Sequence, residues 1–132
     1  MDKFFASESS LIESLSEFMR KLNDEVSALV VVEGLRDAKA LRDAGYDGEL
    51  FMLCHKNNIL SLEETASRFQ KIILLLDNDR EGQKLSARTK KILGGKVRID
   101  TFYQRELLPA SKGKIRHVEE LAPYALRLSR HV

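Results

Sequence analysis

The sequence predicts an α/β fold in which about four mainly parallel strands are flanked by helices. Three short apolar runs, at residues 28–32, 50–54 and 72–76, have the length and composition of strands that are buried on both faces. Between them, apolar residues recur at helical spacing. Because strands and helices alternate along the chain, we expect a parallel sheet joined by helical crossovers and covered on both sides.

The first predicted element is an amphipathic helix over residues 10–21. Apolar side chains recur every three or four positions from Leu11 to Leu22. Ser10 and Glu13 have the spacing of a capping box, which places the start of the helix at Ser10.

A further helix is predicted after the first and the second apolar run. One begins at Leu35 and stops at Gly45, because glycine favours the end of a helix. The other opens at a second capping box, formed by Ser61 and Glu64, and continues to about Gln70.

The last third of the chain is predicted less evenly. A helix is expected over residues 80–93, where a pair of glycines closes it. Polar and apolar side chains alternate over residues 97–103, which indicates an edge strand with one face partly exposed. From about Leu108 the fold is weakly specified, with a short helix over residues 118–128.

The composition fits one domain with a short extension. The chain has 132 residues, of which 43% are hydrophobic, enough for one apolar core. We divide it into an N-terminal amphipathic helical extension, residues 1–27, and a domain over residues 28–132. The extension is expected to pack on the sheet, with a dimer contact as the alternative.

Cys54 is the only cysteine, which excludes disulfide frameworks and cysteine-based zinc sites. Apolar stretches are too short for a membrane span, so we expect a cytoplasmic protein.

Three acidic residues follow two of the predicted strands. Glu33 ends the first strand, and Asp77 and Asp79 follow the third. The carboxyl ends of parallel strands meet at one edge of a sheet, and residues two apart in an extended segment point the same way. Three neighbouring carboxylates repel one another unless a cation lies between them, so we expect Glu33, Asp77 and Asp79 to hold Mg²⁺, which prefers such ligands, with Mn²⁺ as the alternative ion. The competing interpretation is a turn after Glu33 and aspartates that only cap the following helix.

These residues lie in two motifs that resemble those of the Toprim domain. Residues 31–38 (VVEGLRDA) resemble its glutamate motif, and residues 75–82 (LLDNDREG) its Asp-x-Asp motif. Toprim domains occur in topoisomerases, primases, RecR-like repair proteins, OLD-type nucleases and a ribosomal RNA maturation nuclease. The resemblance implies a Rossmann-like three-layer fold and Mg²⁺-dependent chemistry on phosphodiester bonds. It also implies that Glu33 is a general acid or base and that Asp77 and Asp79 hold the metal.

Basic residues are concentrated beyond these acids. Residues 1–79 carry 9 basic and 15 acidic side chains, whereas residues 80–132 carry 13 and 5. One helical face is expected to present Arg80, Lys84, Arg88 and Lys91. This separation of charge favours a polyanionic partner, RNA or DNA, with a solvated helix face as the alternative.

Residues near the second predicted strand are weaker candidates. His55 and Lys56 follow this strand and are candidates for contact with phosphate, with an exposed loop as the alternative. We assign His117 to the same class of exposed loop residues.

Particular residues exclude several other classes of protein. An EF-hand loop would need a glutamate where Arg88 stands, and a haloacid-dehalogenase-type phosphatase usually has threonine or valine where Glu81 stands. The sequence has no glycine-rich phosphate loop. The chain is also too short for the nucleophilic tyrosine domain of a type IA topoisomerase or for the additional parts of a primase.

The leading hypothesis is a Mg²⁺-dependent nuclease or another small RNA- or DNA-processing protein. A non-catalytic module that binds nucleic acid or protein and keeps the metal site is the first alternative. A phosphotransfer enzyme for small molecules is the second. A homodimer or a larger nucleic-acid-processing complex is compatible with each.

Overall fold

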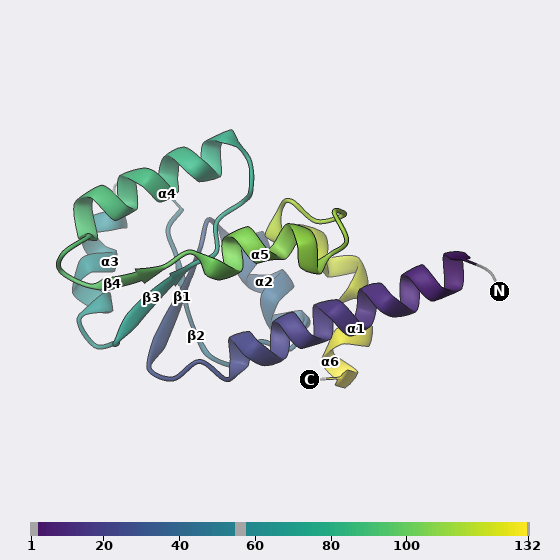
Figure 1. The fold of residues 1–132 in the computed structure, drawn as a ribbon. Helices are drawn as coiled ribbons and strands as arrows, with labels where there is room; N and C mark the ends of the chain where they lie inside the picture. The colour runs from purple at the N-terminus through teal and green to yellow at the C-terminus, as the bar shows by residue number, and fades with distance from the viewer. Residues whose placement is uncertain (1–2, 55–57, 132) are drawn as a thin grey trace.

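The computed structural model of the protein describes residues 3–54 and 58–131 (Figure 1). The strands are β1 (Ala28–Val32), β2 (Glu49–Met52), β3 (Lys71–Leu74) and β4 (Arg98–Asp100). The helices are α1 (Lys3–Asn23), α2 (Leu35–Asp43), α3 (Ile59–Ala66), α4 (Arg80–Leu93), α5 (Phe102–Ala110) and α6 (Ala125–His131), with the 3-10 helix η2 (Val118–Tyr124) directly before α6. All strand pairs are parallel in the order β2-β1-β3-β4, which confirms the predicted α/β fold.

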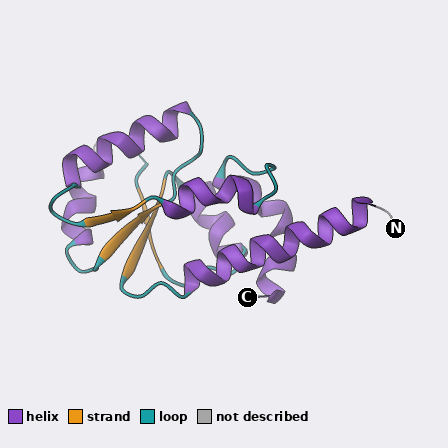
Figure 2. Cartoon of the chain, viewed as in Figure 1, coloured by secondary structure: helices purple, strands orange, loops and turns teal. Residues whose placement is uncertain are grey.

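Helices cover both faces of the sheet (Figure 2). Helices α3 and α4 pack on one face, and α1, α2, α5, η2 and α6 pack on the other. In β1, Val30 and Val32 point into the core under α1 and α2, whereas Leu29 and Val31 point into the core under α3 and α4. This alternation confirms that β1 is buried on both sides, because successive side chains of a strand point to opposite faces.

Helix α1 packs in the same core as the sheet. Its Leu15 and Met19 are fully buried there, beside residues of α5 and α6. Helix α1 therefore packs in the core on this face of the sheet, mainly against α5 and α6.

Both predicted capping boxes are wrong. Ser10 and Glu13 lie inside α1, and Ser61 and Glu64 lie inside α3. Serine and glutamate three residues apart also suit any solvent-facing side of a helix, so the pattern does not locate its first turn. Helix α3 ends before Gln70, because the Gln70 N–H donates to the carbonyl oxygen of Ser27 and the chain already runs toward β3.

The second apolar run is not a strand buried on both faces. Strand β2 lies at an edge of the sheet and ends two residues before Cys54. Met52 is 40% exposed and Cys54 is exposed. An apolar run alone does not show whether a strand has one neighbour or two.

The fourth strand is an edge strand, as predicted, but it is shorter than expected. The carboxylate of Asp100 accepts a hydrogen bond from the Phe102 N–H at 2.8 Å, and the chain turns there into α5. Tyr103 therefore packs in the core opposite to Ile99 and does not share its side of a strand.

The C-terminal segment is more ordered than the sequence indicated. The short helix expected over residues 118–128 is present as two consecutive helices, η2 and α6. Both contribute to the core under α2. In the described part of the chain, no helix combines the length and the hydropathy that crossing a membrane requires.

Candidate metal centre

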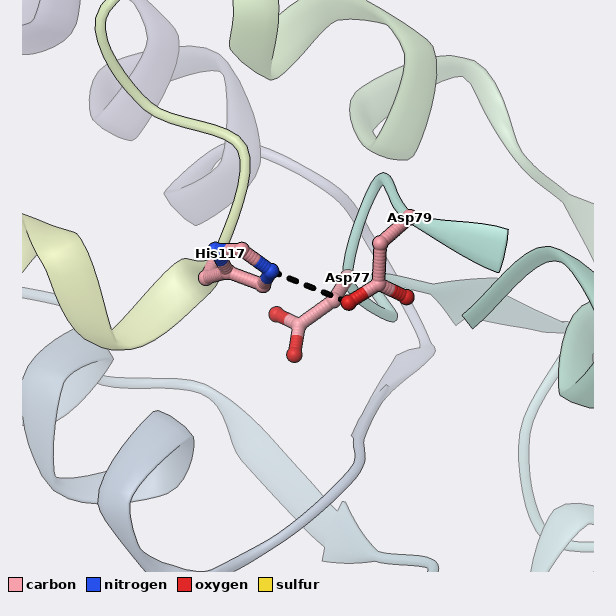
Figure 3. Close-up of side chains that lie close together, drawn as sticks. All are labelled: Asp77, Asp79 and His117. Atoms are coloured by element: carbon pink, nitrogen blue, oxygen red, sulfur yellow. Dashed lines mark hydrogen bonds and ion pairs between the residues drawn. The ribbon is translucent and has the colours of Figure 1, made fainter. Parts of the chain in front are cut away.

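Three side chains converge beyond the carboxyl end of β3. Asp77, Asp79 and His117 each offer one ligand atom, and these atoms lie within 4.8 Å of one another (Figure 3). All three side chains are partly exposed, so an ion can reach them from solvent. Two carboxylates and an imidazole form a donor set suited to a divalent metal.

Asp79 has two tasks in this arrangement. It is the N-cap residue of α4, and its Oδ1 accepts a hydrogen bond from the Gly82 N–H at 2.7 Å. Its Oδ2 lies 2.9 Å from Nε2 of His117. The helix-cap interpretation and the metal-site interpretation are thus compatible, because each uses a different oxygen of the carboxylate.

The loop after β3 is held by the segment that leads into η2. Oδ1 of Asp77 accepts a hydrogen bond from the Val118 N–H at 2.9 Å. The Asn78 N–H donates to the carbonyl oxygen of Arg116 at 2.8 Å. A segment about forty residues away along the chain therefore completes the surroundings of both aspartates.

Glu33 lies beside this loop. Its Oε1 accepts a hydrogen bond from the backbone N–H of Asp77 at 3.2 Å. Among the residues that the structure describes, the cluster of converging ligand atoms does not include Glu33. The structure places all three predicted acids at this loop, but Glu33 contacts its backbone, whereas the converging ligand atoms come from the two aspartates and His117.

Gly82 allows the close approach of α4. A Cβ atom at this position would lie 1.9 Å from the carbonyl oxygen of Asp77 and 3.0 Å from Oε1 of Glu33. Any larger residue would push the first turn of α4 away from the acids.

Burial, more than repulsion between the carboxylates, shifts the pKa values of most of these acids. Burial, with Asp77 nearby, raises the pKa of Glu33 to about 7. Burial also raises the pKa of Asp77, and burial together with Asp77 raises that of Asp37. By contrast, the hydrogen bond from the Gly82 N–H lowers the pKa of Asp79. Negative charge is thus unfavourable at Glu33, Asp37 and Asp77, which is the condition that a bound cation would relieve.

Sequence reasoning missed two residues here. Asp37 is buried at the first turn of α2, where its carboxylate accepts a hydrogen bond from the Gly34 N–H at 3.1 Å. It lies within the glutamate motif, so the motif itself could have indicated it. His117 was assigned to the exposed loops. The only local signal was Glu120 three residues later, with capping-box spacing.

The predicted basic side chains lie on the surface of α4. Arg80, Lys84, Arg88 and Lys91 are exposed, and none forms an ion pair within the described ranges. A second basic group was not predicted: Lys112, Lys114 and Arg116 are exposed in the segment directly before His117. His55 and Lys56 lie outside the described residues.

Comparisons with known proteins agree with this architecture. Residues 28–120 match the family model described as the Toprim domain. A UPF0292 protein of Thermococcus sibiricus is 34% identical over 117 residues, which cover 88% of this chain and 89% of the relative. A UPF0292 protein of Thermococcus gammatolerans is 37% identical over 106 residues, which cover 80% and 78%. A solved structure of a protein from Aquifex aeolicus aligns with a TM-score of 0.59 at 27% identity, over 85% of this chain and 95% of that one.

The two motifs therefore pointed to the correct family. Toprim proteins generally act on nucleic acids and bind a divalent metal, and the cluster of Asp77, Asp79 and His117 is compatible with such an ion. Because the family model matches most of the chain and the relatives are more than 30% identical over most of their length, the chain belongs to the Toprim-domain family and, within it, to the UPF0292 proteins.

Proposed function

We propose that this protein is a divalent-metal-dependent nuclease that acts on structured RNA or DNA. The observation that carries the proposal is the convergence of Asp77, Asp79 and His117, with Glu33 against the same loop. These groups form an acidic site at the carboxyl ends of the strands, where open α/β sheets bind their ligands.

The residues present fit a divalent ion. Asp77 and Asp79 supply the carboxylate oxygens that would hold it, and burial raises the pKa of Asp77, so a cation beside this carboxylate would stabilise its charged form. When bound, the ion neutralises negative charge that develops on the phosphodiester group.

Glu33 is placed to move a proton. It is partly buried, and the N–H of Asp77 fixes one of its carboxylate oxygens. Its pKa of about 7 allows both protonation states near neutral pH, and a dication bound nearby would lower this value. We therefore assign Glu33 the role of proton acceptor from the attacking nucleophile.

Two basic surfaces next to the site support a polyanionic substrate. The exposed residues of α4 begin at Arg80, directly after Asp79. Arg116 adjoins His117, and its carbonyl oxygen accepts the Asn78 N–H. Cationic side chains dominate the affinity of proteins for nucleic acids, so binding should weaken steeply with salt.

Cleavage of labelled structured RNA and DNA, with and without Mg²⁺ or Mn²⁺, tests the proposal. We expect metal-dependent cleavage by the wild type, and strong loss in Glu33→Gln and Asp77→Asn. Asp47→Asn removes the same charge from an exposed residue outside the site and should cleave normally.

Metal-dependent cleavage that persists unchanged in both site variants would overturn the proposal. Salt-sensitive binding without cleavage under any metal would instead indicate a binding module. Failure to bind nucleic acid at low salt would favour phosphotransfer on a small molecule.

A further inference from the structure

We infer that His117 is a metal ligand, and that it makes this site prefer Mn²⁺ and related transition-metal ions over Mg²⁺. The inference rests on the proposed function only in that a metal binds at Asp77 and Asp79. It does not require that nucleic acid is cut.

The position of the imidazole is the first argument. Nε2 of His117 lies 2.9 Å from Oδ2 of Asp79, and it belongs to the set of ligand atoms within 4.8 Å of one another. Figure 3 shows the ring pointing toward the two carboxylates. One cation can therefore contact the nitrogen and both carboxylates after small adjustments of side chains.

The second argument is the partner of the other ring nitrogen. Nδ1 of His117 lies 3.2 Å from Oε1 of Glu120. The same oxygen accepts the backbone N–H groups of His117, at 2.8 Å, and Arg116, at 3.0 Å. Histidines that bind metals usually donate their second N–H to a carboxylate in this way, which directs the lone pair of the first nitrogen toward the ion. Glu120 is therefore a positioning residue for Nε2.

The third argument is that the same contacts fix the histidine and the aspartates. Val118, which follows His117, is fully buried and donates its N–H to Asp77. Arg116, which precedes it, accepts the N–H of Asn78. The residues on both sides of His117 are thus hydrogen-bonded to the loop that carries the carboxylates. An ion can therefore bind without first ordering the segment that carries the imidazole.

The donor set determines the preference. Mg²⁺ favours oxygen ligands and keeps several waters, so an added imidazole contributes little to its binding. Imidazole is a better ligand for first-row transition-metal ions, above all Fe²⁺, Ni²⁺ and Zn²⁺; Mn²⁺ is the weakest binder of that series, but it still accepts an imidazole nitrogen more readily than Mg²⁺ does. Removal of the imidazole should therefore weaken Mn²⁺ binding far more than Mg²⁺ binding.

Calorimetric titration of the metal-free protein with Mn²⁺ and with Mg²⁺ tests the inference. We expect His117→Ala and His117→Gln to weaken Mn²⁺ binding at least about tenfold. The affinity for Mg²⁺ should change less than about threefold. Asp79→Asn should weaken both ions. Glu119→Gln changes charge beside the site on an exposed residue, so it should affect both ions equally and only slightly.

Pulsed electron paramagnetic resonance of the Mn²⁺-loaded protein provides a direct readout. A ¹⁴N coupling from the imidazole is expected in the wild type and should disappear in both His117 variants. Thermal unfolding of the metal-free variants verifies that they remain folded, and the glutamine variant preserves polarity if alanine unfolds the segment.

The possible failures are distinguishable. Mn²⁺ binding without the ¹⁴N coupling, or equal losses of affinity for both ions, would overturn the inference and leave the nuclease proposal intact. A ¹⁴N coupling in a protein that cuts no nucleic acid would support the inference while the nuclease proposal fails. If neither ion binds the wild type, both are wrong.

Discussion

Among the described residues, acidic side chains are paired with a lysine at one end of the sheet, whereas at the other end they gather without such a partner. Near the amino ends of β1 and β3, Lys71 lies 2.6 Å from Glu25 and 3.1 Å from Asp100, and its side chain is only 14% exposed. Beyond the carboxyl ends, Glu33, Asp37, Asp77 and Asp79 gather. In the described chain their only ion-pair partner is His117, which is partly exposed.

This difference separates charges that hold the fold from charges that can hold a ligand. At the amino end, a lysine compensates the acids, and its own pKa is raised by its hydrogen bond to Glu25 despite burial. At the carboxyl end, burial and neighbouring acids raise the pKa of Asp77 and of Glu33. Uncompensated acids of this kind destabilise a protein unless a ligand offsets the repulsion, so they indicate a functional site.

The largest expected effect comes from Asp77→Asn, which separates activity from stability. Asparagine still accepts the Val118 N–H, but it lacks the charge that would hold the metal. We expect cleavage to fall about 1000-fold. The free energy of unfolding of the metal-free protein should be equal or higher by up to about 1 kcal/mol, because one repulsive charge is removed.

Cleavage rates and urea unfolding of the same preparation measure the two effects. Asp47→Asn is the matched control and should change neither. If Asp77→Asn were destabilised enough to account for its whole loss of cleavage, the acids at the carboxyl end would also hold the fold, and the distinction between the two ends of the sheet would be wrong.

Lys71→Met should lower stability and leave cleavage unchanged, the reverse of Asp77→Asn. It leaves Glu25 and Asp100 partly buried without their cation, which should lower the free energy of unfolding by about 3 kcal/mol. Cleavage per folded molecule should stay unchanged. Lys39→Met breaks an exposed pair with Asp43 and should cost less than about 1 kcal/mol in urea unfolding. Equal losses in the two lysine variants would contradict the assigned structural role.

Gly82→Ala should lower both the stability of the fold and the affinity of the site for metal. The new Cβ would overlap the carbonyl oxygen of Asp77, so α4 must shift, at a cost of about 2 kcal/mol in thermal or urea unfolding. Metal affinity should fall as well, because the shift separates Asp79 from Asp77. Gly34→Ala is the control: its Cβ meets no atom within 4 Å, so its cost should stay below about 1 kcal/mol. Unchanged metal binding in Gly82→Ala would show that the approach of α4 is not needed.

The smallest expected effect is a loss of stability at alkaline pH, caused by titratable groups near the amino ends of the strands. Burial and a hydrogen bond to Glu25 raise the pKa of Tyr103 above its usual 10.0, and the pKa of Lys71 is raised above 10.5. Both groups hold their protons more tightly in the folded protein, so their contribution is complete below pH 10 and is lost as the pH rises.

Urea unfolding between pH 8 and pH 11 tests this. The wild type should lose about 1 kcal/mol more than Tyr103→Phe over this interval. Tyr46→Phe is a second comparison, because burial also raises the pKa of Tyr46, to about 12, although its hydroxyl donates to the carbonyl oxygen of Glu49 and not to Glu25; this variant should also lose less stability than the wild type. A wild type that becomes more stable toward pH 11 would show that the sign is wrong.

Local sequence patterns predicted most of the fold. The β-branched run of β1 and the regular spacing in α4 are short-range features, and α4 begins and ends where predicted. The predicted ends of other elements were less accurate. Capping-box spacing misplaced the first turns of α1 and α3, and the contact of Asp100 with the Phe102 N–H ended β4 early. Both errors arose because a side chain can accept a hydrogen bond in several backbone contexts.

The sequence by itself determined the alternation of strands and helices and the acids that follow β1 and β3, because each depends on residues close together in the chain. Only the tertiary structure decided that β2 is an edge strand and that His117 faces Asp79. Both depend on contacts between distant segments: the packing of η2 and α6 on α2 brings residues 116–120 to the loop after β3. No local pattern encodes that contact, since its free energy comes from apolar side chains such as Val118 and Leu121, buried far from the acids along the chain.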